Sequence, residues 1–184
     1  MATLTFHNIA LTPVINGLKN AHFFINKGYE YAQSHSIDPN DFLSASLHPD
    51  MRDFRFQVHR FTDIAKGIPS RVNPQNETLT FSDDPQTFPE LLERIEKTIK
   101  YLEGIDESSF EGRDGEKVVM QFRNGELEAT YSGLGFVMGS AHPNFWFHVT
   151  TAYDILRHKG VDLGKVDFLN GAKLVEIKPV AKPT

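Results

Sequence analysis

The amino-acid sequence predicts a mainly α-helical protein, a four-helix bundle with a small β-hairpin inserted between the third and fourth helices. Three observations support this prediction. Four segments carry apolar residues at helical spacing, one Asn-Gly pair separates two segments of alternating polarity, and no internal repeat divides the chain. The 184 residues suffice for one buried core and are too few to expect two, so a single domain over residues 1–184 is expected.

The first helix is expected over about residues 8–33. Proline lacks an N–H and is tolerated in the first turn of a helix, so Pro13 places the start of the stable helix near Thr12. The buried stripe of this helix recurs at helical spacing and consists of Leu11, Val14, Leu18, Ala21, Ile25 and Ala32.

The second helix is expected over about residues 49–66, with Gly67, Ile68 and Pro69 as its end. Residues 67–86 contain three prolines and no helical period. A connection of this length is either a crossover along the bundle or a lid, and a crossover is the favoured interpretation.

The third helix is expected to begin after Thr87 and to continue to about Glu103. Thr87 and Glu90 have the spacing of a capping box, with a hydroxyl at the cap and a carboxylate three residues later. Gly104 then ends the helix.

A β-hairpin is expected over about residues 117–132. Residues 117–122 and 126–131 alternate in polarity and flank Arg123, Asn124 and Gly125. Asn-Gly favours a type I′ turn, which requires positive φ at both central residues. A glycine-rich apolar passage follows over residues 133–139.

The fourth helix is expected over about residues 144–158, with Gly160 directly after its end. The remaining chain is short and rich in turn residues, and a loose tail is expected over about residues 171–184.

Composition limits the partners and the location. The chain has 19 Lys and Arg against 24 Asp and Glu, a net charge of −5, so neither nucleic acid nor an anionic membrane is expected as a partner. Without cysteine it has no disulfide, no thiolate nucleophile and no Cys-ligated zinc. No apolar run reaches the ~18 residues of a membrane span, and no secretory signal pattern opens the chain, so a cytoplasmic location is expected.

Histidine is the only abundant residue type here that titrates near neutral pH or binds metals. On one helix, His148 and His158 would lie about 15 Å apart, too far to share an ion. A metal site would therefore need ligands from several helices, and His22, His59 and His148 are the candidates. The favoured interpretation is that most of the eight histidines are structural or lie on the surface.

Arg55, His59 and Asp63 recur every four residues along one edge of the second helix. In a catalytic interpretation, Asp63 orients the imidazole of His59 and raises its basicity. In the favoured interpretation, the three residues form a solvated ladder that adds a few tenths of a kcal/mol per pair.

Aromatic residues cluster around the fourth helix and predict either an apolar pocket for a ring-bearing small molecule or a solid core. In the pocket interpretation, the ligand contacts are Phe136, Phe145, Trp146, Tyr29, Tyr153, His22 and His148. By helical periodicity, Phe147 is the one phenylalanine that does not fall at a core position, and it is expected on the surface.

Residues 143–161, PNFWFHVTTAYDILRHKGV, resemble the C-terminal signature of an uncharacterised bacterial and fungal family in the DinB/YfiT-like helical-bundle superfamily. Its other recurring pieces resemble residues 49–51, 57–58, 63, 65–66, 94–98 and 163–169. This resemblance implies a DinB-like four-helix bundle over nearly the whole chain. The superfamily includes divalent-metal enzymes that use three histidines, but the last helix here lacks their paired histidines. The resemblance therefore carries a metal role only to His148 and His59.

These observations predict a small-molecule-binding bundle, a metabolic enzyme in which His148 is a general acid or base on a partly aromatic substrate. Tyr153, His59 and Asp63 are its expected catalytic neighbours. One alternative is a transferase, isomerase or hydrolase that depends on a divalent metal, zinc or nickel. Another is a non-catalytic binding or dimerising protein. Bundles with exposed apolar helix faces frequently form two-fold dimers, so a homodimer is expected.

Overall fold

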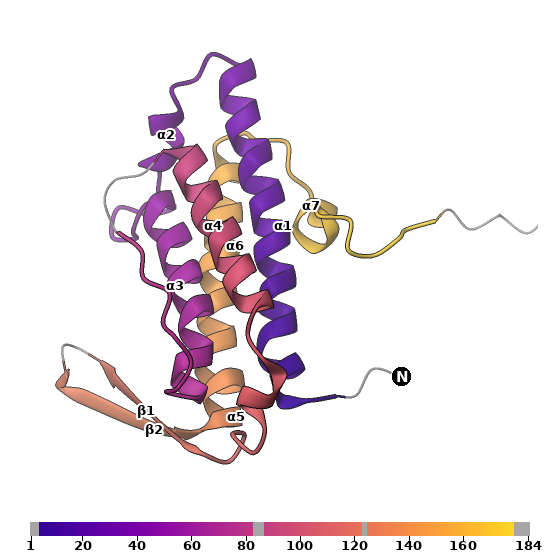
Figure 1. Ribbon diagram of the computed structural model, residues 1–184. Helices are drawn as coiled ribbons and strands as arrows, with labels where there is room; N and C mark the ends of the chain where they lie inside the picture. Colours follow the sequence, from indigo (N-terminus) through magenta and orange to yellow (C-terminus); the bar gives the residue numbers. More distant parts are fainter. Residues whose placement is uncertain (1–3, 83–86, 123–124, 179–184) are drawn as a thin grey trace, which may run out of the picture.

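The computed structural model describes residues 4–82, 87–122 and 125–178, and it confirms the four-helix bundle (Figure 1). The long helices α1 and α3 both pack against α4 and α6, which closes the bundle around one core. The long helices are α1 (Phe6–Ser34), α3 (Phe54–Val72), α4 (Phe88–Glu103) and α6 (His142–His158). The shorter ones are α2 (Pro39–Leu43), η1 (Glu107–Phe110), α5 (Gly133–Phe136), the π-helical turn η3 (Val137–Ala141) and α7 (Lys165–Asn170).

Helix α1 begins at Phe6, two turns before the predicted start near Thr12. The Thr5 hydroxyl caps it by accepting a hydrogen bond from the backbone N–H of Asn8 at 3.2 Å. Pro13 lies inside the helix because burial of the whole predicted apolar stripe offsets the one hydrogen bond that proline removes. In this region Nε2 of His142 also lies 2.9 Å from the carbonyl oxygen of Ala10, so α6 ties the proline-containing turn to the core.

Helix α3 is displaced toward the C-terminus relative to the prediction. It begins at Phe54 because the Asp53 carboxylate caps it, accepting from the backbone N–H of Phe56 at 2.9 Å. It continues to Val72, past Pro69, which was expected to end it. Pro69 is buried and its carbonyl still accepts from the N–H of Asn73 at 2.8 Å, so the last turn is retained.

The chain between α3 and α4 runs back along α4, so these two helices are parallel (Figure 1). The hydroxyl of Tyr101 donates to the carbonyl of Glu77, and Nη1 of Arg94 donates to the carbonyl of Ser82 at 3.1 Å. The structure thus agrees with the crossover interpretation of the segment 67–86 for residues 73–82, whereas residues 67–72 belong to α3. Residues 83–86 of that segment lie outside the described residues.

The predicted hairpin is confirmed. Strand β1 (Lys117–Phe122) pairs antiparallel with β2 (Leu127–Ser132), and the hairpin extends sideways from one end of the bundle (Figure 1). Gly125 has φ +92°, as a tight turn requires, while Arg123 and Asn124 lie outside the described residues. The glycine-rich passage after the hairpin folds as α5 and η3. These turns run directly into α6, so the fourth helix begins earlier than residue 144.

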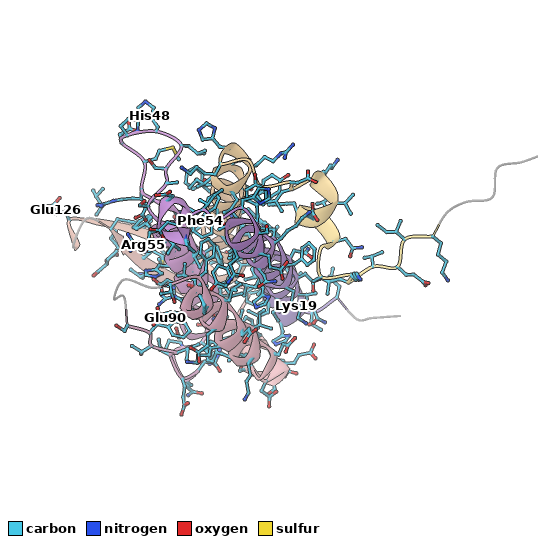
Figure 2. The ribbon with its side chains drawn as sticks, turned by 90° about the horizontal axis from the view of Figure 1, so that it is seen from above. Lys19, His48, Phe54, Arg55, Glu90 and Glu126 are labelled. Atoms are coloured by element: carbon cyan, nitrogen blue, oxygen red, sulfur yellow. The ribbon has the colours of Figure 1, made fainter. Side chains whose placement is uncertain are left out.

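Viewed along the bundle, Phe54 lies among the helices, while Lys19, Arg55 and Glu90 lie toward the outside (Figure 2). Helix α7 packs against α1, where the side-chain amide of Asn20 donates to the carbonyl of Leu169 and accepts from the N–H of Ala172, both at 3.0 Å. The chain after α7 is exposed over residues 173–178, and residues 179–184 lie outside the described part. Among the described helices, none has the length and apolar character needed to cross a membrane.

Candidate functional site

His148 lies on the side of α6 that faces α3, and only 9% of its surface is exposed. Its Nδ1 lies 2.7 Å from Oε1 of the buried Gln57. The Gln57 amide nitrogen donates to the carbonyl of Arg52 at 2.9 Å, so the amide oxygen is the atom that faces His148. An amide oxygen can only accept. The proton of neutral His148 is therefore assigned to Nδ1, and the lone pair to Nε2.

Burial and the positive charge of Arg60 both disfavour the imidazolium form of His148. Burial is the larger cause, and together they lower the pKa of His148 from 6.5 to about 4. The ring is therefore neutral at pH 7. Among the residues that the structure describes, Nε2 has no hydrogen-bond partner, and it is not one of their fully enclosed unpaired atoms. The protein thus leaves this nitrogen available to a ligand.

A cavity of about 260 Å³ lies between α3, the hairpin, η3 and the start of α6, within one helical turn of both Gln57 and His148. Arg60, one turn after Gln57, and Asn144, one turn before His148, both line it. Its apolar wall consists of Ile64, Met120, Phe122 and Phe136. His148 is not a lining residue, so the cavity begins one helical turn from this residue and does not enclose its ring as the sequence predicted.

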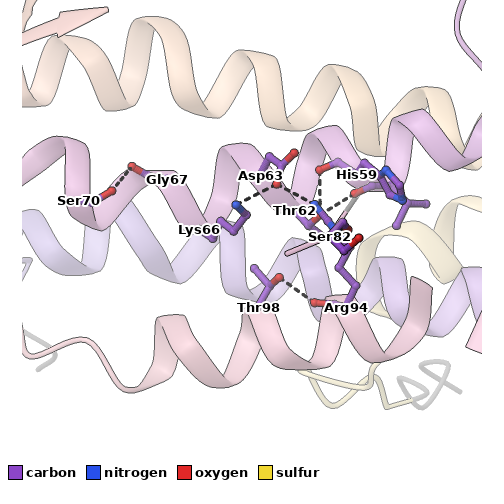
Figure 3. A network of polar contacts seen from close by, with 10 residues as sticks. His59, Thr62, Asp63, Lys66, Gly67, Ser70, Ser82, Arg94 and Thr98 are labelled. Carbon is purple, nitrogen blue, oxygen red and sulfur yellow. Dashed lines mark hydrogen bonds and ion pairs between the residues drawn. The ribbon is translucent and has the colours of Figure 1, made fainter. Parts of the chain in front are cut away.

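Asp63 belongs to an ion-pair network that joins α3 to α4 (Figure 3). Its Oδ1 lies 2.7 Å from Nη2 of Arg94 and 3.1 Å from Nζ of Lys66. The buried Arg94 also donates from Nε to the hydroxyl of Thr62 at 2.8 Å. The predicted pairing of Asp63 with His59 is therefore wrong, because this carboxylate bonds the two cations instead.

His59, one turn before Asp63 on α3, lines a wide open depression of about 660 Å³ together with Arg52 and Phe56. Arg55, one turn before His59, lies 3.5 Å from the carboxylate of Asp53. The ladder of Arg55, His59 and Asp63 is thus not formed, because its two outer members bond residues other than His59.

The three candidate metal ligands have different surroundings. His22 lies at the α1–α4 surface, with Nε2 2.9 Å from the carboxylate of Glu96, whereas His148 lies between α3 and α6. Within residues 4–82, 87–122 and 125–178, no three His, Asp or Glu side chains are close enough together to hold a metal ion. His22, His59 and His148 therefore do not form the three-histidine metal site that the superfamily resemblance implies.

Most of the predicted aromatic contacts pack against other aromatic rings at or beside the core. The Tyr153 ring meets Phe24 and Phe168 edge to face, with centroids 5.7 and 5.5 Å away, on the side of α6 that faces α1 and α7. Phe145 and Trp146 pack against each other with centroids 5.0 Å apart. Tyr29 stacks on Phe88 at 5.3 Å. Of the predicted ligand contacts, Phe136 lines the 260 Å³ cavity, and Phe147 is exposed as expected.

Sequence reasoning missed Gln57 and the two arginines of the cavity, Arg60 and Arg71. Gln57 carried a readable signal, because it is a polar residue within the apolar stripe of Phe54, Val58 and Phe61. The arginines gave none, since the hairpin that lines the cavity with them is placed by tertiary packing.

Comparison with known proteins agrees with this architecture. Residues 6–169 match the family described as a domain of unknown function, DUF1993. The chain belongs to this family. A crystal structure of a DinB family member protein from Shewanella denitrificans is similar to this DUF1993 chain, with a TM-score of 0.80 and 29% identity over 96% of this chain and 95% of that chain. The DinB-like fold expected from the resemblance is thus confirmed. No curated protein matches.

Proposed function

We propose that this DUF1993 protein binds a small molecule in the cavity between α3, the hairpin and α6, and that neutral His148 acts toward it as a hydrogen-bond or proton acceptor. The observation that carries the proposal is the 2.7 Å contact between His148 Nδ1 and Gln57 Oε1. This contact fixes the proton on one ring nitrogen and leaves the other as an acceptor.

The lowered pKa narrows the role of His148. With a pKa of about 4, only about one ring in a thousand carries the second proton at pH 7. General-acid chemistry from the resting protein is therefore disfavoured. The same low pKa makes Nε2 a weak base, so accepting a hydrogen bond is the main role that we propose for it. If Nε2 takes a proton from a ligand hydroxyl or N–H, the Nδ1–H bond to Gln57 stabilises the imidazolium while Arg60 destabilises it. The accepted proton is then readily passed on.

The tautomer of His148 tests the proposal without any ligand. Long-range ¹H–¹⁵N NMR spectra, assigned with a His148→Asn variant, are expected to show the proton on Nδ1 between pH 6 and 8. Small aromatic compounds that bind the cavity are expected to shift the Nε2 resonance of His148, with the exposed His158 as the internal reference. A proton found on Nε2, or binding without any response of His148, would contradict the proposal.

A further inference from the structure

We infer that the cavity between α3, the hairpin and α6 accepts an organic anion with a small apolar body, whose negative group lies between Arg60 and Arg71. This inference rests on the proposed function, since it names the ligand class of the same cavity.

The first observation is a pair of unneutralised positive charges. Arg60 and Arg71 both line the cavity from α3, and a spacing of about three turns places them on the same face of that helix. Among the described residues, neither guanidinium has an ion pair or a hydrogen bond to another side chain. Burial and then the charge of Arg60 lower the pKa of Arg71, and the opposing effect of Asp63 is smaller, which agrees with two like charges held near each other.

The second observation is that the carboxylate of Asp63 already forms ion pairs with other cations. Among the described residues, Asp63 is the one acidic residue that lines the cavity, and its Oδ1 bonds both Arg94 and Lys66. Its single negative charge is therefore shared with two cations outside the Arg60–Arg71 pair. A bound carboxylate or similar anion would supply the missing charge and accept hydrogen bonds from both guanidinium groups.

The third observation is a glycine that makes room for one of these arginines. A Cβ atom added to Gly67 would lie 1.7 Å from Nη1 of Arg71, so the guanidinium lies directly on the backbone of α3 at this residue. Glycine inside a helix costs about 1 kcal/mol relative to alanine. Gly67 thus leaves room for the Arg71 guanidinium, which a Cβ atom at this residue would force to move.

The remaining walls define the rest of the ligand. The cavity is also lined by Phe122 and Met120 from the hairpin and by Phe136 from α5. A volume of about 260 Å³ is at the lower end for ligand pockets, which suits one ring or a short chain and excludes a nucleotide. The ligand class is therefore a small monoanion with an aromatic or aliphatic body.

Matched pairs of probes test this inference on the full-length protein. Calorimetric titrations at low salt compare benzoate, phenylacetate and 3-phenylpropionate with their uncharged amides, which have nearly the same shape. The best carboxylate is expected to bind about tenfold more tightly than its amide, the usual effect of a charge-assisted hydrogen bond. Equal affinities, or no binding by any of the three carboxylates, would overturn the inference.

Three variants locate the binding site. Arg60→Gln and Arg71→Gln are each expected to weaken carboxylate binding about tenfold and to leave amide binding unchanged. Gly67→Ala is expected to weaken it as well, because it displaces Arg71 without changing the net charge. Arg157→Gln is the control, since that guanidinium bonds the carbonyl of Val161 at the far end of α6 and is expected to have no effect. Circular dichroism verifies that each variant is folded, and parent-like carboxylate affinity in the Arg71 variant would refute the site.

These experiments distinguish a failure of the anion inference from a failure of the proposed function. If carboxylates and amides bind equally well and both shift the His148 resonance, the anion inference is wrong and the proposed function stands. If the carboxylate is preferred but the His148 ring never responds to it, the anion site stands and the acceptor role of His148 is wrong.

Discussion

The imidazole of His148 and the side-chain amide of Gln57 form a hydrogen bond of 2.7 Å that joins the middle of α6 to the first turn of α3. Helical periodicity places Gln57 at a core position. A polar contact is therefore found where an apolar contact would be expected. Both groups are buried, and each therefore depends on the other to satisfy its hydrogen-bonding capacity. The same bond sets the tautomer on which the proposed function depends.

Two substitutions of Gln57 separate its effect on stability from its effect on the pKa of His148. Gln57→Leu leaves the Nδ1–H of His148 without an acceptor, and we expect the free energy of unfolding to fall by about 1–3 kcal/mol in urea denaturation. Gln57→Glu keeps an acceptor and adds a negative charge beside the ring, so the pKa of His148 is expected to rise. An NMR titration of the ring measures that change. A Gln57→Leu variant as stable as the parent would show that the bond contributes nothing.

The pKa of His148 also predicts how stability depends on pH. The folded-state pKa of about 4 lies below the unfolded value of 6.5, so the unfolded chain binds more protons between these two values. The stability that His148 contributes is therefore fully present above pH 6.5 and is lost as the pH falls toward 4. The full loss is at most about 3 kcal/mol.

Denaturant unfolding at several pH values tests whether the free energy of unfolding falls as the pH is lowered. The parent is expected to lose stability between pH 6.5 and 4.5 more steeply than His148→Asn, because asparagine does not titrate. His158→Asn is the matched control, since it removes an exposed histidine ring about three turns further along α6. Identical slopes for the parent and His148→Asn would contradict the lowered pKa.

The helices were predictable because their signals are local. The capping box formed by Thr87 and Glu90 and the Asn-Gly turn of the hairpin depend on neighbouring residues alone, and both elements are found where the sequence placed them. The errors at Pro13 and Pro69 have the opposite origin. In both cases tertiary packing continues a helix through a residue that disfavours it locally.

For a related reason, the sequence predicted the burial of His148 but not the side chains that pair within the candidate site. Helical periodicity placed His148 at the edge of the buried face of its helix, which is correct. The pairing of side chains from different helices depends on how each helix is rotated about its axis, and single-sequence periodicity fixes that rotation only coarsely. Asp63 therefore bonds Arg94 of α4 and not the expected His59. Gln57 was likewise not recognised as the partner of His148.

Arg94 is expected to contribute more to stability than any surface ion pair. Its three guanidinium nitrogens donate in different directions, to the Thr62 hydroxyl, the Asp63 carboxylate and the Ser82 carbonyl. The guanidinium also lies 4.4 Å from the Phe81 ring centroid, which fastens the crossover to the bundle. Arg94→Met is expected to lower the free energy of unfolding by about 3 kcal/mol, and Arg94→Lys to recover only part of it, because an ammonium group lacks the guanidinium geometry.

The ion pair of Lys97 with Glu93 provides the control for this measurement, because it lies on the exposed side of the same helix. Lys97→Ala is expected to cost less than about 1 kcal/mol. Full recovery of stability in Arg94→Lys would mean that the positive charge alone matters, contrary to the three-directional bonding.

Two glycines offer a final test of how closely the helices pack. A Cβ atom at Gly17 of α1 would lie 2.7 Å from the Trp146 ring and 2.8 Å from the Phe145 ring, both of α6, whereas one at Gly139 would have no neighbour within 4 Å. Gly17→Ala is therefore expected to cost about 1–3 kcal/mol through overpacking. Gly139→Ala is expected to be neutral or to stabilise by up to about 1 kcal/mol, since alanine is the better helix former. Trp146 is the only tryptophan, so its fluorescence reports the change directly, and a shifted emission is expected only for Gly17→Ala. Equal stabilities for the two variants would show that α1 and α6 do not approach as closely at Gly17 as the structure places them.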